Sequence, residues 1–137
     1  MSYTAHRLEY FNVTMNTTAD EAYEVLDNLA KLGANFLAIN AVPVGPQSTQ
    51  LTLFPQDSSM LQAIAKQAGL QLVGPYPAVI VQGEDQPGIL ALIHKKLHQN
   101  HIQAFTSTAV TDGKGRYGCI LYLRAEDANR AVKALSD

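Results

Sequence analysis

The stretch that decides the fold is Val79-Ile80-Val81-Gln82-Gly83-Glu84-Asp85-Gln86-Pro87-Gly88-Ile89-Leu90. A β-branched run, an acidic turn and Pro-Gly before an apolar, helix-periodic segment predict a strand, a sharp loop and the start of a helix. Proline suits a first helical turn, because its missing N–H has no intrahelical acceptor to lose. Gly88 lets a ligand approach the free N–H groups there, which form a small anion site. Asp85 can cap the helix or hold a cation, so the loop suits both ends of a free amino acid. The alternative is a well-capped turn that binds nothing.

The same residues carry a family resemblance. Asp85, Pro87, Gly88, Ile89 and Leu90 match the D-x-P-G-hydrophobic-hydrophobic signature that opens the ACT domain, a small regulatory module attached to phosphoglycerate dehydrogenase and aspartokinase. The chain resembles an ACT domain over residues 77–135, and less plainly a second one before it. The resemblance implies a βαββαβ ferredoxin-like fold that binds amino acids at domain interfaces.

Composition limits the classes of function. The 137 residues are 47% hydrophobic, enough for a core but near the lower limit for two independent ones, so we expect two halves that share a sheet or an interface. The net charge is -2 and the basic residues are scattered, which argues against binding to nucleic acid or to an anionic membrane. The single cysteine, Cys119, excludes an internal disulfide framework. The N-terminus lacks a signal-peptide core and no run reaches membrane-spanning length, which predicts a cytoplasmic protein.

Periodicity along the chain predicts the element order βαββαβ, followed by a second start. The first half has expected strands at 8–13, 36–44, 51–54 and 70–73, and expected helices at 18–32 and 57–68. Thr18 with Glu21 predicts a capping box, Asp57 or Ser58 a helix cap, and Gly33 and Gly69 helix ends. After the punctuation Gly74-Pro75-Tyr76-Pro77 come an expected strand at 78–81, a helical stripe, a hairpin of 102–110 with 117–123, and a helix at 126–135. The stripe consists of Ile89, Leu90, Ile93 and Leu97.

A shift of 68 positions superimposes the two halves without a gap. It carries Val13 onto Val81 and Leu29 onto Leu97, as internal duplication would, although chance matching of periodic segments is the alternative. The shift places Asp137 on Gly69, so the second copy stops where the fourth strand of the first begins. We therefore expect an α+β protein of two tandem ferredoxin-like, ACT-like units, residues 1–74 and 75–137, the second without its fourth strand.

The missing strand leads to a prediction about assembly. In the ferredoxin-like order 4-1-3-2, its loss leaves the strand at 76–81 on an open edge, which invites pairing. We expect this edge to be covered by a strand of another subunit or by a segment of the first copy such as 70–73, with a homodimer as the expected outcome.

The two copies retain different parts of the family's ligand pattern. In place of Asp85, Pro87 and Gly88 the first copy has Thr17, Ala19 and Asp20. The resemblance implies that an asparagine in a G-x-N segment helps to bind the effector across an interface. The first copy has this segment as Gly33-Ala34-Asn35, whereas the second has His101-Ile102-Gln103.

This asymmetry predicts one composite site and a weak or empty opposite one. The site would combine a loop of one unit with Asn35 of the other, and the loop consists of Glu84, Asp85, Gln86, Pro87, Gly88, Ile89 and Leu90. Backbone N–H groups near Gly88 would hold the ligand carboxylate, and Asp85 and the Asn35 amide oxygen would accept from its ammonium. We also expect Gly88→Val to remain folded and to lose binding.

Other candidate sites are weaker, and neither a cofactor nor a metal is expected. His94 and His98 lie four apart on a helix and His101 follows, but no carboxylate is well spaced beside them, which favours a solvated helix edge. Cys119 alternates with apolar neighbours along a strand and is typical of a small core residue. Gly113-Lys114-Gly115 is too short for a phosphate-binding loop and indicates a hairpin tip.

The sequence thus predicts a non-catalytic regulatory protein that senses an amino acid and modulates a partner enzyme or transporter. Two alternatives remain open. One is a purely structural dimerisation module with an empty loop. The other is a small enzyme on the same fold, such as a monooxygenase or a metal-dependent enzyme that uses His94 and His98, because a fold alone does not settle function. The sequence does not identify the amino acid.

Overall fold

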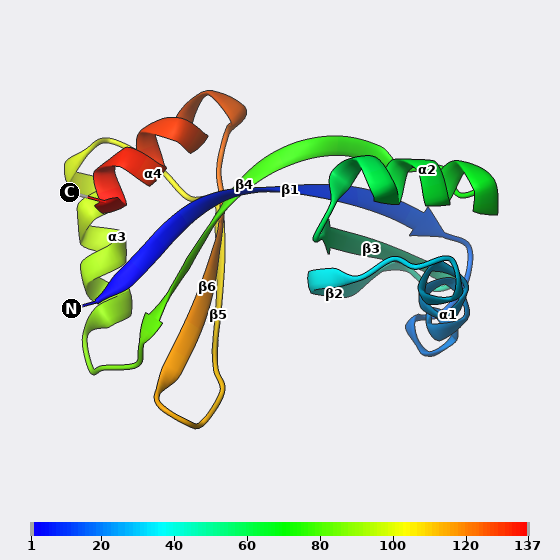
Figure 1. Cartoon of the computed structure of the whole chain (residues 1–137), viewed down its shortest axis with the longest axis horizontal. Coiled ribbons are helices and arrows are strands. Elements are labelled where there is room, and N and C mark those ends of the chain that lie inside the picture. The colour runs from blue at the N-terminus through cyan, green and yellow to red at the C-terminus, as the bar shows by residue number, and fades with distance from the viewer. Residues whose placement is uncertain (1, 137) are drawn as a thin grey trace. The chain divides into compact units, whose positions relative to one another are not determined.

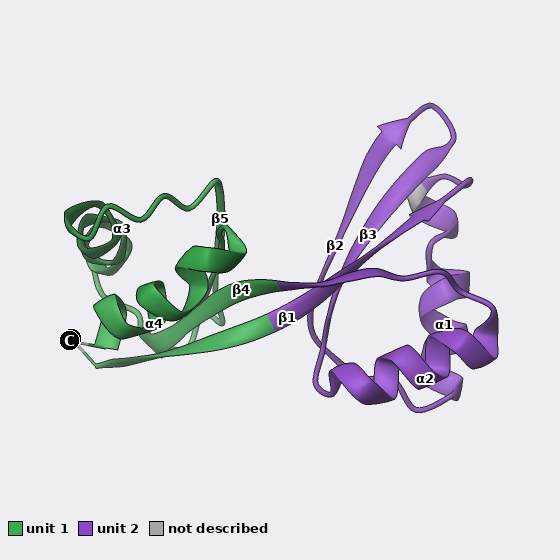
Figure 2. Cartoon of the chain, turned by 90° about the horizontal axis from the view of Figure 1, so that it is seen from above, with its two compact units in different colours: residues 1–8, 77–137 green, residues 9–76 purple. Residues whose placement is uncertain are grey.

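The chain forms two compact units, one of them built from two separated stretches of sequence (Figure 2). In the computed structural model, Glu9–Tyr76 forms what we call the continuous unit, and Met1–Leu8 with Pro77–Asp137 forms the split unit. The structure describes residues 2–136 and, of Ala19, only the backbone, so Asp137 lies outside the described residues. The units differ from the predicted continuous segments 1–74 and 75–137, because residues 2–8 pack with the second repeat.

The continuous unit has the ferredoxin-like strand order β2-β3-β1-β4. Its elements, labelled in Figure 1, are β1 (Tyr3–Met15), α1 (Tyr23–Lys31), β2 (Phe36–Gly45), β3 (Ser48–Pro55), α2 (Ser58–Ala68) and β4 (Val73–Glu84). β3 pairs antiparallel with both β1 and β2, which sets Phe11 opposite Leu53 and Val13 opposite Leu51. Alternate residues of β1 and β3 therefore point to one face, where they pack with Leu29 of α1 and with α2.

The predicted strand at 78–81 is part of the longer strand β4, which contributes to both units. Of the predicted strand at 70–73 only Val73 belongs to β4, and residues 70–72 form no strand. The conformation of Gly74 explains why the segment Gly74-Pro75-Tyr76-Pro77 does not interrupt β4. Its φ is +139°, and a Cβ there would lie 2.9 Å from the Tyr10 carbonyl oxygen. Glycine therefore allows close approach to β1 and continues the strand.

Local signals define α2 well and α1 poorly. The Asp57 side chain accepts from the Met60 N–H at 3.0 Å and Gly69 ends the helix at φ +71°, as predicted. The predicted capping box at Thr18 and Glu21 is wrong. Ala19–Glu21 forms a 3-10 turn, α1 begins only at Tyr23, and the Thr17 hydroxyl donates to the Glu21 carboxylate. In a capping box the Glu21 carboxylate would accept from the Thr18 N–H. Here it accepts from the Thr17 hydroxyl instead.

The split unit repeats the same topology with its fourth strand taken from the first residues of the sequence. Its order is β1-β4-β6-β5, with α3 (Ile89–Gln99), β5 (Thr106–Thr111), β6 (Arg116–Tyr122) and α4 (Ala128–Ser136). As predicted, residues 75–136 contain no fourth strand for the second repeat, and residues 3–8 of β1 occupy that place beside β4. The Glu84 N–H donates to the Ser2 carbonyl at 3.3 Å. The edge of β4 is therefore covered by a segment of the first copy, which is one of the two predicted covers, although the segment is 3–8 and not 70–73. This edge no longer argues for a dimer.

Gly83 and Tyr3 explain how β1 fits against this unit. A Cβ on Gly83 would lie 2.4 Å from the Ser2 carbonyl oxygen and 2.7 Å from the Tyr3 Cβ, so only glycine leaves room. The Tyr3 hydroxyl donates to the Leu135 carbonyl at 2.6 Å and accepts from Lys96 Nζ at 2.7 Å. Residues 2–8 are thus tied to β4, α3 and α4.

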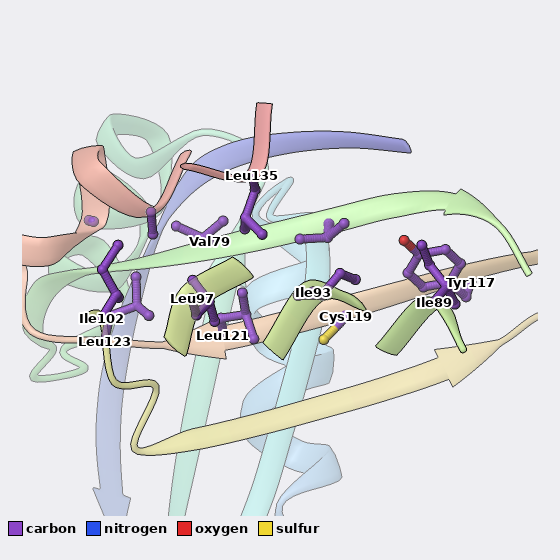
Figure 3. Close-up of a cluster of buried hydrophobic side chains, with 13 residues drawn as sticks. Val79, Ile89, Ile93, Leu97, Ile102, Tyr117, Cys119, Leu121, Leu123 and Leu135 are labelled. Atoms are coloured by element: carbon purple, nitrogen blue, oxygen red, sulfur yellow. The ribbon is translucent and has the colours of Figure 1, made fainter. Parts of the chain in front are cut away.

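The split unit has its own hydrophobic core (Figure 3). Val79 and Val81 of β4 and Cys119 and Leu121 of β6 are fully buried, and Ile93 packs onto them from α3. Cys119 is thus a core residue, as predicted. Leu90 differs from the rest of the predicted stripe, because its side chain is 39% exposed.

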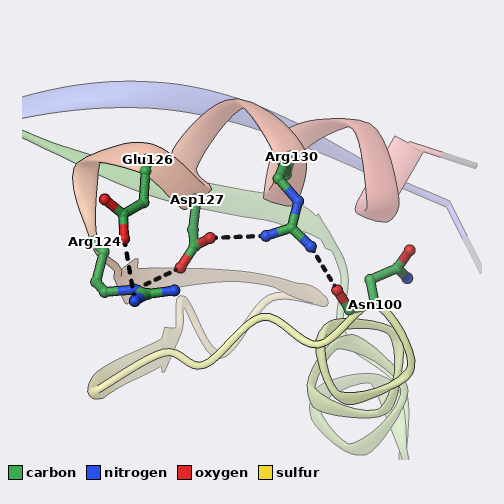
Figure 4. A network of polar contacts seen from close by, with 5 residues as sticks. All are labelled: Asn100, Arg124, Glu126, Asp127 and Arg130. Atoms are coloured by element: carbon green, nitrogen blue, oxygen red, sulfur yellow. Dashed lines mark hydrogen bonds and ion pairs between the residues drawn. The ribbon is translucent and has the colours of Figure 1, made fainter.

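A polar network fastens the start of α4 to the end of α3 (Figure 4). Asp127 is only 2% exposed, and its carboxylate accepts from Arg124 Nε at 3.0 Å and from Arg130 Nη1 at 2.8 Å. Arg130 Nη2 also donates to the Asn100 carbonyl at 2.8 Å. The carboxylate is therefore paired and hydrogen-bonded, as a buried charge requires.

Candidate functional site

The predicted binding loop, residues 84–90, runs from the last residue of β4 through an exposed turn at 85–88 into the first two residues of α3. Its side chains are exposed except for Ile89, which is buried in the core. The Asp85 N–H donates to the Gly115 carbonyl at 2.8 Å, and the Ile89 N–H donates to the Gln86 carbonyl at 3.2 Å. These backbone bonds fix the loop from both sides.

The start of α3 differs from the predicted arrangement. The helix begins at Ile89, with Gly88 as its N-cap, so Pro87 lies in the turn before the helix instead of in its first turn. No described side chain caps the helix, so the predicted capping role of Asp85 is wrong. The Leu92 N–H bonds to the Gly88 carbonyl at 3.0 Å. The N–H groups of Leu90 and Ala91, which precede Leu92 in the first turn, have no acceptor within the helix.

Two features favour glycine at position 88: its backbone conformation and the open space around it. Its φ is +88°, in the left-handed region, and nothing lies within 4 Å of the position that a Cβ would occupy. A β-branched residue is strongly disfavoured at such a φ. Gly88→Val would therefore strain the backbone, which corrects the expectation that this variant separates binding from folding.

Asn35 lies in the continuous unit, whereas the 84–90 loop lies in the split unit. Its amide oxygen accepts from the Phe36 N–H at 3.0 Å, and its carbonyl accepts from the Gln56 N–H at 3.1 Å. The amide oxygen retains a second lone pair. The residue helps to line a groove of about 380 Å³ between α1 and β2, with Leu26, Ala30, Ala34, Phe36, Ala38 and Ile39.

The split unit has a groove at the matching place. It measures about 440 Å³ and is lined by His94, Leu97, His98, His101, Ile102, Gln103 and Ala104. The 68-residue shift relates the two linings, carrying Asn35 onto Gln103. The groove of the continuous unit is mainly apolar, whereas three imidazoles line the other. The sequence already grouped His94 and His98 with the following His101, and the structure places all three on one groove.

Cys119 and Asp112 are two titratable groups whose pKa values are shifted by their surroundings. Burial raises the pKa of the Cys119 thiol above its ordinary value, which opposes its ionisation and nucleophilic use. At the hairpin tip, the backbone N–H groups of Lys114 and Arg116 hold the pKa of Asp112 below its usual value. The Asp112 carboxylate accepts both at 2.7 and 3.2 Å, so 112–116 is a side-chain-stabilised turn, as predicted.

Within residues 2–136, no helix is both long and apolar enough to cross a membrane. The described residues also contain no group of three or more His, Cys, Asp or Glu side chains arranged to hold a metal ion.

Comparison with known proteins identifies the architecture. The sequence matches no family model and no curated protein. Among solved structures, a Bacteroides thetaiotaomicron protein is 14% identical with a TM-score of 0.79, over 96% of this chain and 88% of its own. The regulatory subunit of aspartate kinase from Thermus thermophilus is 15% identical with a TM-score of 0.68, over 99% and 95%. Its counterpart from Thermus flavus is 14% identical with a TM-score of 0.60, over 99% and 95%. The predicted ACT-like resemblance is thus confirmed at the level of the fold: the chain has the tandem α+β architecture of aspartate kinase regulatory subunits.

Proposed function

We propose that the chain is a non-catalytic regulatory protein that binds a free amino acid at the 84–90 loop and modulates a partner enzyme or transporter. The geometry of the loop carries the proposal. Gly88, in the left-handed region with open space around it, leads into the Leu90 and Ala91 N–H groups, which have no acceptor within the helix. Exposed Asp85 supplies an acceptor of opposite charge in the same loop. The shared fold supports a regulatory role, because two of the matched structures are described as regulatory subunits.

The two charged ends of an amino acid require opposite partners. The free N–H groups and the positive end of the helix dipole favour the carboxylate. The Asp85 carboxylate favours the ammonium, and the Asn35 amide oxygen stays the predicted second acceptor. A hydrogen bond to a charged group contributes about 1.5 to 3 kcal/mol, so Asp85→Ala should weaken binding by roughly ten- to a hundredfold.

A thermal-shift screen of the twenty amino acids, followed by calorimetric titration of the best ligand, tests the proposal. Gly88→Asn is a better probe than the valine variant, because asparagine tolerates a positive φ while its side chain occupies the approach to the helix. We expect Asp85→Ala and Gly88→Asn to lose affinity, Asn35→Ala to lose less, and the control Thr17→Ala to retain it. Equal losses for Thr17→Ala and Asp85→Ala, or no stabilisation by any amino acid, would contradict the assignment.

One observation favours self-association as a second proposal. β2 is an edge strand of 10 residues without a charged side chain. Residues 32–56 contain no Asp, Glu, Lys or Arg at all. Leu37, Ile39, Val42 and Val44 are between 41% and 53% exposed. Proteins commonly protect such edges with charges, so an unprotected apolar edge favours pairing. We propose that β2 pairs with β2 of a second copy.

Light scattering on the full chain tests this dimer. Ile39→Lys places a charge on the β2 edge and should shift the mass to that of one chain. Thr108→Lys places the same charge on the edge strand β5 and serves as the control. A parent chain that is monomeric at all concentrations would exclude the dimer without touching the amino-acid proposal.

A further inference from the structure

The groove of the split unit contains three of the four histidines in the chain. His94 and His98 lie on α3, and His101 follows the helix. Residues four apart on a helix lie on one face, so the two helical imidazoles are neighbours. The fourth histidine, His6, lies outside this groove.

The internal repeat shows what the fold requires at these three positions. The 68-residue shift matches them with Leu26, Ala30 and Gly33. Leu26 and Ala30 line the equivalent groove of the continuous unit, which holds its shape without imidazoles. None of the three histidines is therefore demanded by the repeated fold.

His101 occupies a position that favours glycine. Its φ is +57°, and it is the only residue other than glycine with a positive φ among residues 2–136. The matching Gly33 has φ +99°. A side chain in this region carries a conformational cost that glycine avoids. His101 adopts this unfavourable conformation, and its side chain lines the groove.

The hydrogen bonds of His94 determine its tautomer. Its Nδ1 lies 2.7 Å from the Leu90 carbonyl oxygen, which can only accept, so Nδ1 carries the hydrogen. In the neutral ring Nε2 is then an acceptor, and the Ser107 hydroxyl donates to it at 3.1 Å. A metal-bound histidine commonly donates its other N–H to a backbone carbonyl in this way, which orients the ring and increases its basicity.

We propose that this groove binds a divalent transition metal ion, with His94 Nε2 and His98 as its two protein ligands. The ion takes the place of the Ser107 hydrogen on the lone pair of His94. Water or a carboxylate from solution completes the coordination, which agrees with the absence of a three-ligand protein cluster in the described chain. Imidazole favours Zn²⁺, Ni²⁺ and Cu²⁺ over Mg²⁺ and Ca²⁺. His101 lines the entrance, and the site does not depend on amino-acid binding at the 84–90 loop.

Calorimetric titration of the tag-free full chain with Zn²⁺ and Ni²⁺ tests the site. We expect one ion per chain and a higher melting temperature in its presence. His94→Gln and His98→Gln each remove one ligand while keeping a good helix former, and each should weaken binding by at least about tenfold. His6→Gln removes an imidazole elsewhere and should bind as the parent does. Circular dichroism confirms that each variant is folded.

Three results would overturn the proposal. They are no heat of binding at millimolar Zn²⁺ or Ni²⁺, equal affinity in the parent, His94→Gln and His98→Gln, or loss of binding in His6→Gln alone. Mg²⁺ at the same concentration distinguishes an imidazole site from weak general attraction of cations, because it should not bind.

Discussion

Gly83→Ala tests the central feature of the fold, the packing of residues 2–8 against β4. The added methyl group would lie 2.4 Å from the Ser2 carbonyl oxygen, 2.7 Å from the Tyr3 Cβ and 2.9 Å from the Tyr3 Cα. Two of these three atoms belong to the backbone, so rotation of a side chain cannot relieve the overlap. The N-terminal part of β1 must move away from β4.

The size of the effect follows from the cost of overpacking, about 1 to 3 kcal/mol. Alanine also restricts the unfolded chain, which returns about 0.4 to 1 kcal/mol. We therefore expect a net loss of about 1 kcal/mol in the free energy of unfolding. Gly118→Ala is the matched control, because Gly118 pairs with Gln82 in the same sheet and a Cβ there meets nothing within 4 Å.

Urea unfolding of both variants gives the comparison, and hydrogen exchange locates it. Gly83→Ala should unfold at a lower urea concentration and exchange faster along residues 3–8, whereas Gly118→Ala should unfold at or slightly above the parent midpoint. Equal midpoints for the two variants would mean that residues 2–8 do not pack against Gly83, and the assignment of the fourth strand would fail.

Three further variants test local features. Asp127→Ala removes the acceptor shared by two arginines, which are half-exposed and can return to water, so urea unfolding should show a loss of about 2 kcal/mol; no loss would mean that the network is only a surface contact. His101→Gly relieves a left-handed side chain and should raise stability by about 1 kcal/mol, or about 3 °C in melting temperature, whereas a lower melting temperature would contradict the strain. The buried Cys119 thiol has its pKa raised above 9.0, so the unfolded chain releases this proton first and stability should fall as the pH rises past about 9. Urea midpoints from pH 7 to 10 measure this fall, and Cys119→Ala should remove part of it.

Local chemistry made most elements predictable. Asp57 caps α2 and Gly69 ends it because each acts within one turn of the backbone. The hairpin at Asp112 is equally local, because its carboxylate bonds to N–H groups two and four residues away. The capping box failed because Thr17, a competitor one residue earlier, engages Glu21.

Local sequence signals could not predict the pairing of strands that lie far apart in the chain, such as β1 with β4. Residues 3–8 contain His6 and Arg7 and lack a clear alternation, so only their partner in β4 identifies them as a strand. Gly83 carried a hint, because a glycine inside a β-branched run often marks the close approach of another backbone. At the candidate site, the sequence indicated the loop and its glycine. It did not indicate that Gly88 is the N-cap, because that depends on its positive φ. The sequence named His101 after His94 and His98 but did not place it on the groove, because that place follows from the left-handed turn after α3.

The divided composition of the split unit has a consequence for synthesis on the ribosome. The continuous unit can complete its sheet once Tyr76 has emerged, since all of its strands and helices are then available. Residues 2–8 are translated before the second repeat and find their partners only at its end, because the Tyr3 hydroxyl bonds to a carbonyl 132 positions later in the chain. Contacts this distant close slowly and expose unpaired strand edges in the meantime. During translation, residues 2–8 therefore stay unpaired after the continuous unit is able to fold, and a premature stop codon anywhere in the second repeat would leave them without the sheet that they complete.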